Sequence, residues 1–120
     1  MINITALVGR HAAERKIESG VAVVFVPHTT AGVTINENAD PAARLDIEST
    51  LDRMVPWDGP YRHAEGNSAA HVKASLVGHS SVVPVRGGRL VLGTWQGIYL
   101  CEFDGPRTRN VNVQVVAARA

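Results

Sequence analysis

Cysteine and aromatic residues are scarce in this sequence. Its 120 residues include a single cysteine, and phenylalanine, tryptophan and tyrosine together make up 5%. One cysteine excludes a disulfide within the chain, which makes a reducing compartment the simplest setting. Cys101 follows Tyr99 and Leu100, and in this apolar context we expect a small buried hydrophobic residue.

Long hydrophobic runs are also missing. The longest apolar segment extends from Val21 to Pro27, whereas a membrane-spanning helix needs about 20 apolar residues. The first residues do not combine a basic region, an apolar stretch and a small-residue cleavage site, as a secretory leader does. We therefore expect no membrane segment and no secretion, and we predict a cytoplasmic protein.

The chain has almost no net charge. Twelve Lys and Arg residues against eleven Asp and Glu give +1, and the basic residues are scattered along the sequence. This argues against a phosphate-neutralising face and therefore against a nucleic-acid partner. With 45% hydrophobic and 19% charged residues, the chain has the composition of a globular protein, and its length suits one domain over residues 1–120.

The first third of the sequence predicts a helix and two strands. Thr5 can cap a helix that continues to about Ser19, with Gly20 as its end. Residues 21–26 are almost continuously apolar and β-branched, which predicts a strand buried on both faces. Residues 31–36 alternate less regularly and give a weaker strand signal.

Two further helices and four strands are predicted from the remaining sequence. Asp40 and Pro41 suit a helix start, with the helix ending near Val55, and Asn67 or Ser68 can begin another that ends at Gly78. The later pattern predicts an antiparallel four-strand meander over residues 80–85, 89–92, 98–103 and 109–116. The fold class that follows is α+β, with an antiparallel sandwich-like sheet and about three helices.

Three histidines and a glutamate stand out as chemical groups. His28 follows the predicted buried strand, while His63 and Glu65 lie in the loop that leads to the helix bearing His71. Imidazoles from a strand end, a loop and a helix can form an open three-histidine site for zinc, with Glu65 as a proton acceptor. The spacing is not an established metal signature, so unrelated surface histidines are the alternative.

Other polar segments suggest substrate contacts. The helix start at Asn67, with Lys73 nearby, can hold a phosphate, although an ordinary capped helix explains it equally well. Trp95 can stack on a ring, or it can simply pack in a hairpin loop. Arg107 and Arg109 can bind phosphate, or they can keep an edge strand soluble.

Taken in order, several motifs resemble the YjbQ-like family. They are His-Thr-Thr-Ala-Gly at 28–32, Asn-Glu-Asn-Ala-Asp-Pro at 36–41, His63, Glu-Gly-Asn at 65–67, His-Val-Lys-Ala-Ser-Leu-Val-Gly at 71–78, Leu-Gly-Thr-Trp-Gln-Gly-Ile at 92–98, Glu102 and Arg109. The match covers nearly the whole chain from Val21 onward. Members of the family usually place a strand before the first helix, and the segment before Thr5 is short for one.

The resemblance implies an α+β sandwich-type fold, a homotrimer and a secondary thiamine-phosphate synthase activity. That reaction joins a pyrimidine methyl diphosphate to a thiazole phosphate and releases diphosphate, with a divalent metal, zinc or magnesium, to neutralise the leaving group. A non-catalytic trimer that binds a metal or a metabolite is the alternative. A metal-assisted hydrolase shares the histidines but needs an activated water.

The motifs and the chemistry together define the expected site. The expected metal ligands are His28, His63 and His71. The expected catalytic residues are Glu65, Gln96 and Glu102, and of the two glutamates Glu65 is favoured as the proton acceptor. The expected substrate contacts are Thr29, Thr30, Asn36, Asn67, Lys73, Ser75, Trp95, Arg107 and Arg109.

Overall fold

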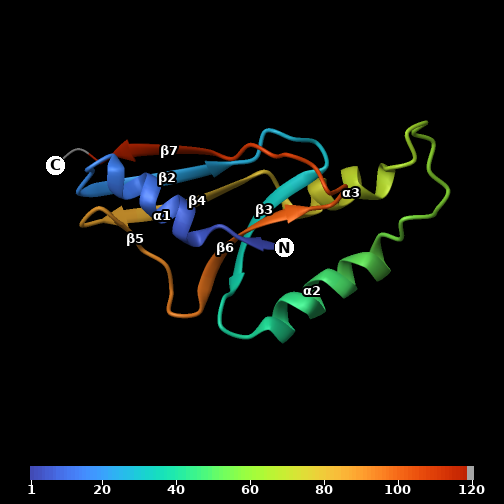
Figure 1. Cartoon of the computed structure of the whole chain (residues 1–120), viewed down its shortest axis with the longest axis horizontal. Coiled ribbons are helices and arrows are strands. Elements are labelled where there is room, and N and C mark those ends of the chain that lie inside the picture. The colour runs from blue at the N-terminus through green and yellow to red at the C-terminus, as the bar shows by residue number, and fades with distance from the viewer. Residues whose placement is uncertain (119–120) are drawn as a thin grey trace.

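Three helices and two antiparallel sheets make up the computed structural model, which describes residues 1–118 (Figure 1). The elements are β1 (Ile2–Asn3), α1 (Thr5–Glu14), β2 (Ser19–Phe25), β3 (Ala31–Glu37), α2 (Pro41–Met54), α3 (Ser68–Val77), β4 (Ser80–Arg86), β5 (Arg89–Leu90), β6 (Gln96–Glu102) and β7 (Asn112–Ala117). The predicted α+β class is confirmed.

The strands are ordered β1-β6-β3 in one sheet and β5-β4-β2-β7 in the other. The predicted four-strand meander is therefore wrong beyond the β4–β5 hairpin. Strand β6 is buried from Gly97 to Cys101 and becomes the centre of the smaller sheet, while β7 returns to pair with β2. Local alternation predicts that a segment is a strand, but it does not specify the partner.

Helix α1 is shorter than predicted. It ends at Glu14, after which Lys16 adopts a positive φ of 53° and the chain turns into β2. Gly20 lies inside β2, where a Cβ atom would collide with the carbonyl oxygen of Val116 on β7. This glycine therefore permits close strand approach and does not end the helix.

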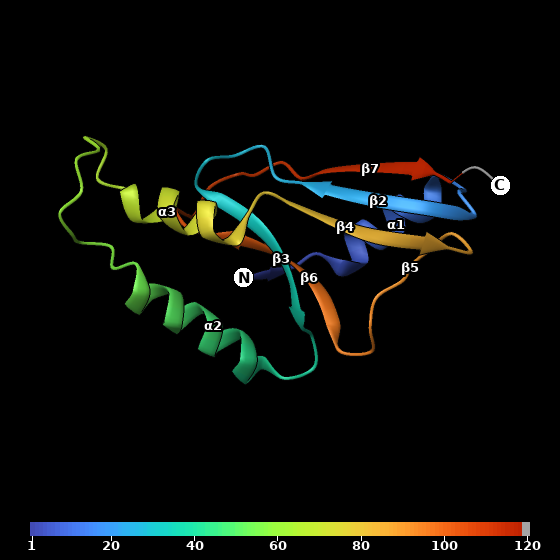
Figure 2. The ribbon, with the colours of Figure 1, turned by 180° about the vertical axis from the view of Figure 1, so that it is seen from behind.

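Strand β2 has one buried face and one open face. Ala22 and Val24 are buried, as is Val26 directly after the strand, whereas Val21 and Val23 are only partly buried and Phe25 is exposed. Helix α1 covers one side of the larger sheet, and the opposite side has no helix over it (Figure 2). The prediction of a strand buried on both faces is therefore wrong for this single chain.

The predicted helix starts at residues 40 and 67 are confirmed to within a residue. The Asp40 carboxylate accepts from the Ala42 amide at 2.9 Å and caps α2. Helix α2 buries none of its own residues, and its Leu45 and Met54 side chains are exposed. Asn67 precedes α3 without forming a side-chain cap.

The core lies between the two sheets and under α1. Its buried members come from several elements, and they are Ile4, Val8, Val24, Val26, Ala31, Val33, Val83, Ile98 and Leu100. Cys101 is buried, as predicted. Before α1 lies the two-residue strand β1, which pairs with β6.

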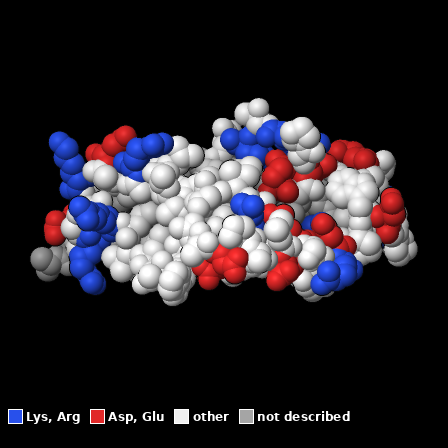
Figure 3. Space-filling view, turned by 60° about the horizontal axis from the view of Figure 1, so that its bottom comes forward, with Lys and Arg blue, Asp and Glu red and all other residues white. Residues whose placement is uncertain are grey.

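Charge is distributed unevenly over the molecule. On the face shown in Figure 3, Lys and Arg gather at the end that carries the β4–β5 turn and mix with Asp and Glu toward the other end, while a broad stretch between them is uncharged. Within residues 1–118, no helix is both long enough and apolar enough to cross a membrane.

Candidate functional site

An open pocket of about 680 Å³ lies at the end of the larger sheet where β2 leads into β3. We call it the histidine pocket. It is lined by Phe25, Val26, Pro27, His28, Thr29, Thr30, His63, Glu65, Asn67, His71, His79, Asp104, Arg107 and Arg109. Segments that are far apart in sequence therefore meet here: the end of β2, the loop before α3, the start of α3 and the β6–β7 connection.

Several hydrogen bonds fix the Arg109 side chain in the wall of the histidine pocket. Its side chain is 7% exposed and binds Glu102 through two bonds, from Nε to Oε1 at 2.7 Å and from Nη2 to Oε2 at 2.5 Å. Nη2 also donates to Thr30 Oγ1 at 2.9 Å. The hydrogen bond from Arg109 lowers the pKa of Glu102, and the same bond raises the pKa of Arg109. Both groups are therefore charged at neutral pH.

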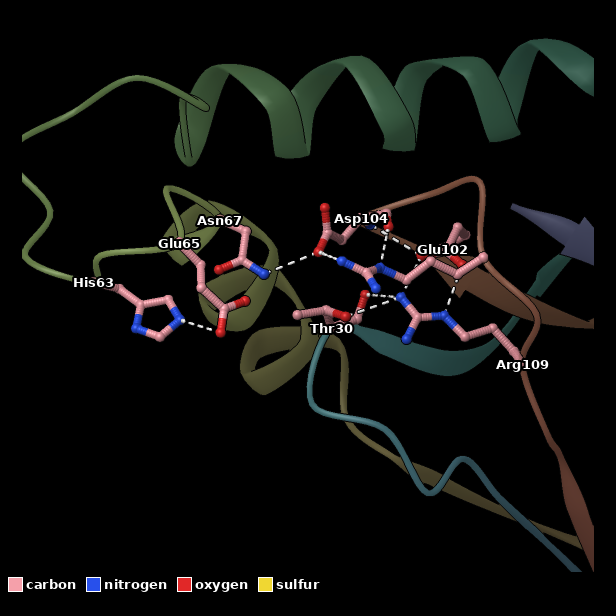
Figure 4. A network of polar contacts seen from close by, with 8 residues as sticks. Thr30, His63, Glu65, Asn67, Glu102, Asp104 and Arg109 are labelled. Atoms are coloured by element: carbon pink, nitrogen blue, oxygen red, sulfur yellow. Dashed lines mark hydrogen bonds and ion pairs between the residues drawn. The ribbon is translucent and has the colours of Figure 1, made fainter.

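Asp104 connects the β6–β7 loop to α3 (Figure 4). Its Oδ2 accepts from Asn67 Nδ2 at 2.9 Å and from Arg107 Nη2 at 3.0 Å. The hydrogen bond from Asn67 is the main cause of a lowered pKa for Asp104, and Arg107 acts in the same direction. Asp104 is therefore an ionised acceptor that fixes the Asn67 amide.

The three predicted metal ligands all line the pocket but do not form a ligand group as placed. His63 and His71 meet edge to face with ring centroids 5.1 Å apart. His28 Nε2 accepts from the Asn110 amide at 2.9 Å, which leaves the ring proton on Nδ1 and no free lone pair for a metal. Among residues 1–118, no cluster of three or more His, Cys, Asp or Glu residues is placed to hold a metal. Metal binding therefore stays a prediction.

Two predicted contacts on α3 face away from the pocket. Lys73 is 8% exposed and pairs with Asp52 of α2, beside a second cavity of about 280 Å³. Ser75 donates its hydroxyl to the His71 carbonyl oxygen at 2.9 Å within the helix. Glu102 lines the second cavity and not the histidine pocket. Its carboxylate therefore binds Arg109 on the side of the guanidinium that faces away from the histidine pocket.

The remaining predicted contacts lie at the opposite end of the smaller sheet. Strands β3 and β6 pair from Ala31 with Glu102 to Glu37 with Gln96. Seven residues of strand separate these ends by about 20 Å at roughly 3.3 Å per residue. Asn36, Trp95 and Gln96 are therefore remote from the histidine pocket of the same chain, and Gln96 instead accepts from the Gly93 amide.

The sequence reasoning missed Asp104 and His79. Asp104 belongs to an Asp-Gly-Pro segment, and such a segment is typical of a turn that ends a strand. Its position three residues before Arg107 is the one local sign of its role, because such spacing permits the ion pair that the structure shows. His79 stands alone between α3 and β4, and no local pattern marks it as a pocket residue.

Comparison with known proteins places the chain in a family. Residues 1–118 match the family described as UPF0047 protein YjbQ-like. The UPF0047 protein YugU of Bacillus subtilis is 54% identical over 117 residues, which span 97% of this chain and 89% of that protein. UPF0047 protein MJ1081 of Methanocaldococcus jannaschii is 47% identical over 116 residues, or 97% and 84% of the two chains.

Solved structures agree with this result. A protein of the YjbQ/UPF0047 family from Clostridium acetobutylicum superposes with a TM-score of 0.94 at 56% identity, covering 96% of this chain and 89% of that one. A YbjQ-like protein of unknown function from Sulfolobus solfataricus superposes with a TM-score of 0.93 at 33% identity, covering 98% and 86%. The chain is therefore a member of the YjbQ-like UPF0047 family.

Proposed function

We propose that the histidine pocket binds a small phosphorylated heterocycle. The observation that carries this proposal is the convergence of hydrogen-bond donors from distant segments on one open pocket. Arg107 and Arg109 use Nε and Nη2 for bonds within the chain, and in residues 1–118 neither Nη1 group has a bonded partner. Planar guanidinium groups held in this way suit phosphate oxygens.

The reaction that suits this pocket is the synthase step implied by the family resemblance. A thiazole nitrogen bonds to the methylene carbon of a pyrimidine methyl diphosphate, and the carbon–oxygen bond to diphosphate breaks with its electron pair leaving on diphosphate. The two arginines stabilise the charge that builds on diphosphate. No proton moves in this step, so we assign Glu65 an electrostatic role beside the developing positive carbon in place of proton acceptance.

A divalent metal, zinc or magnesium, would add charge neutralisation for diphosphate. His63 and His71, whose ring centroids lie 5.1 Å apart, are two neighbouring imidazoles that could contribute ligands. The positions of the histidines do not provide a third ligand, so the proposed step depends only on the residues of the chain.

A metabolite-binding protein without catalysis is the second candidate. It is favoured by the internal pairing of the charged groups, since Arg107 binds Asp104 and Arg109 binds Glu102. It is also favoured by the distance of Trp95 from the pocket, because the ring-stacking residue of the catalytic hypothesis lies at the far end of β6.

A homotrimer remains our proposal for the assembly. The open face of the larger sheet presents the apolar residues Val21, Val23, Phe25, Val82, Pro84 and Val116, together with the polar residues Ser80, Arg86, Asn112 and Gln114. A solvent-facing sheet surface normally alternates polar residues into these positions, and apolar patches of this kind mark interaction sites. Phe25 also lines the histidine pocket, so a second copy on this face would border the site.

A synthase assay separates the two functional candidates. The wild type and Glu65→Gln are incubated with both substrates at several magnesium and zinc concentrations, and thiamine phosphate is measured. We expect product from the wild type and a rate lower by about 100-fold in Glu65→Gln, on the scale of losing one electrostatic group. Glu18→Gln, an exposed change outside the pocket, is the matched control. Equal and near-zero product from wild type and Glu65→Gln rejects catalysis and leaves the binding protein.

A further inference from the structure

Asn67 holds an unused hydrogen-bond acceptor at the wall of the histidine pocket. The residue is 6% exposed and lines the pocket. Its Oδ1 atom is buried and has no hydrogen-bond partner in residues 1–118. A buried acceptor without a partner is destabilising, so a native structure normally supplies a partner for it.

The orientation of the Asn67 amide follows from its neighbour. An ionised carboxylate can only accept hydrogen bonds, and Asp104 is held in that form by Asn67 and Arg107. The amide nitrogen must therefore face Asp104, as the 2.9 Å contact shows. Rotating the amide by 180° would place two acceptors against each other, so Oδ1 is fixed on the other side.

A carboxylate lies on the Oδ1 side of Asn67. In Figure 4, Asn67 Oδ1 points to the side on which Glu65 and His63 lie, away from Asp104. The Glu65 carboxylate lines the same pocket and repels an anion on this side. The donor Arg109 lies on the other side of Asn67, beyond Asp104 (Figure 4). The pocket therefore has a donor region at Arg109 and an acceptor region at Glu65 and Asn67 Oδ1.

We infer that Asn67 is a specificity-determining residue, whose Oδ1 accepts a hydrogen bond from a nitrogen donor of the bound ligand. The ligand class is an anionic heterocycle that carries an amino group or a ring N–H. The anionic group would occupy the donor region while the nitrogen donor faces Asn67 and Glu65. This inference rests on the proposed function, because it assigns the second recognition group of the same ligand.

Two probes that differ by one amino group test the inference. They are a pyrimidine methyl diphosphate with a ring amino group and the same compound with hydrogen in its place, each titrated by calorimetry in the absence of thiazole phosphate. We expect the wild type to bind the amino probe about 10-fold more tightly, the value of one hydrogen bond of about 1.4 kcal/mol. In Asn67→Ala the two affinities should become equal.

Asn110→Ala is the matched control, because this asparagine is exposed and contacts His28 only through its backbone. It should keep the 10-fold preference. The wild-type ratio tests the inference even where Asn67→Ala does not fold. Equal binding of both probes by the wild type, as expected if a water molecule satisfies Oδ1, overturns this inference and leaves the proposed function intact. No binding of either probe overturns both.

Discussion

Arg109 Nη2 lies 2.9 Å from Thr30 Oγ1 and 3.2 Å from the Thr30 carbonyl oxygen. These contacts join residues 79 positions apart and attach the β6–β7 connection to the turn between β2 and β3. The carbonyl oxygen of Thr30 also accepts from the Phe103 amide at 3.2 Å. The pocket wall is thus fixed by one guanidinium that satisfies several acceptors.

Replacing Arg109 with alanine should destabilise the fold. The change removes the charged partner of the largely buried Glu102 and the donor to Thr30 Oγ1, and breaking such a pair typically costs about 3 kcal/mol or more. Urea unfolding followed by circular dichroism measures the loss. Arg107→Ala removes an exposed guanidinium and should change the free energy of unfolding by less than about 1 kcal/mol. Similar losses of unfolding free energy in both variants would contradict the structural role of Arg109.

Acid should weaken the pair that Arg109 forms with Glu102. The pKa of Glu102 is lowered from 4.5 in the folded chain, mainly by the hydrogen bond from Arg109. A depressed pKa contributes stability above its ordinary value, and that stability is lost as the pH falls through the folded value. Below pH 4.5 the wild type should therefore lose stability more steeply than Glu102→Gln. Parallel stability curves for the two proteins would exclude this coupling.

The open face of the larger sheet, which presents Val82 beside Val23, should carry the subunit contact. Val82 is 59% exposed on this face, and Leu7 on α1 is also 59% exposed. Val82→Glu places a charge in the proposed interface and should shift a trimer to monomers at micromolar concentration, measured by light scattering with size exclusion. Leu7→Glu should leave the trimer unchanged. A monomeric wild type, or a Val82→Glu variant that stays trimeric, would rule out this interface.

Zinc uptake provides a direct test of the metal prediction. His71→Ala should remove zinc that is retained by the pocket, because His63 and His71 form its closest imidazole pair. Zinc content is measured by elemental analysis after dialysis, and circular dichroism checks the fold. His11 lies on α1 outside the pocket, so His11→Ala should retain zinc. Unchanged zinc in His71→Ala would exclude this pocket as the metal site.

Cys101 should be almost inert in the folded protein. Burial raises the pKa of its thiol to about 11, and only the thiolate reacts readily. At pH 8 we expect a disulfide reagent to label the native protein at least about 100-fold more slowly than the urea-unfolded chain, because both thiolate fraction and access fall. Fast labelling of the native protein would show that the β6 region opens.

The amino-acid sequence by itself determined the elements and the pocket residues that belong to local motifs. Asp40 and Pro41 predict the start of α2 because a cap and a fixed φ act within one turn. His28, His63 and His71 were selected by motif, and all line one pocket. Cys101 was expected to be buried from its apolar neighbours alone, and it is.

Only the tertiary structure decided which strands pair and which motifs meet. Strand β6 lies between β1 and β3, and this pairing carries Trp95 and Gln96 away from the histidine pocket, although their motif is as distinct as the others. The role of Asp104 likewise depends on Asn67, which is 37 residues away in sequence. Contacts of this kind arise from side-chain packing between elements, and local periodicity does not encode them.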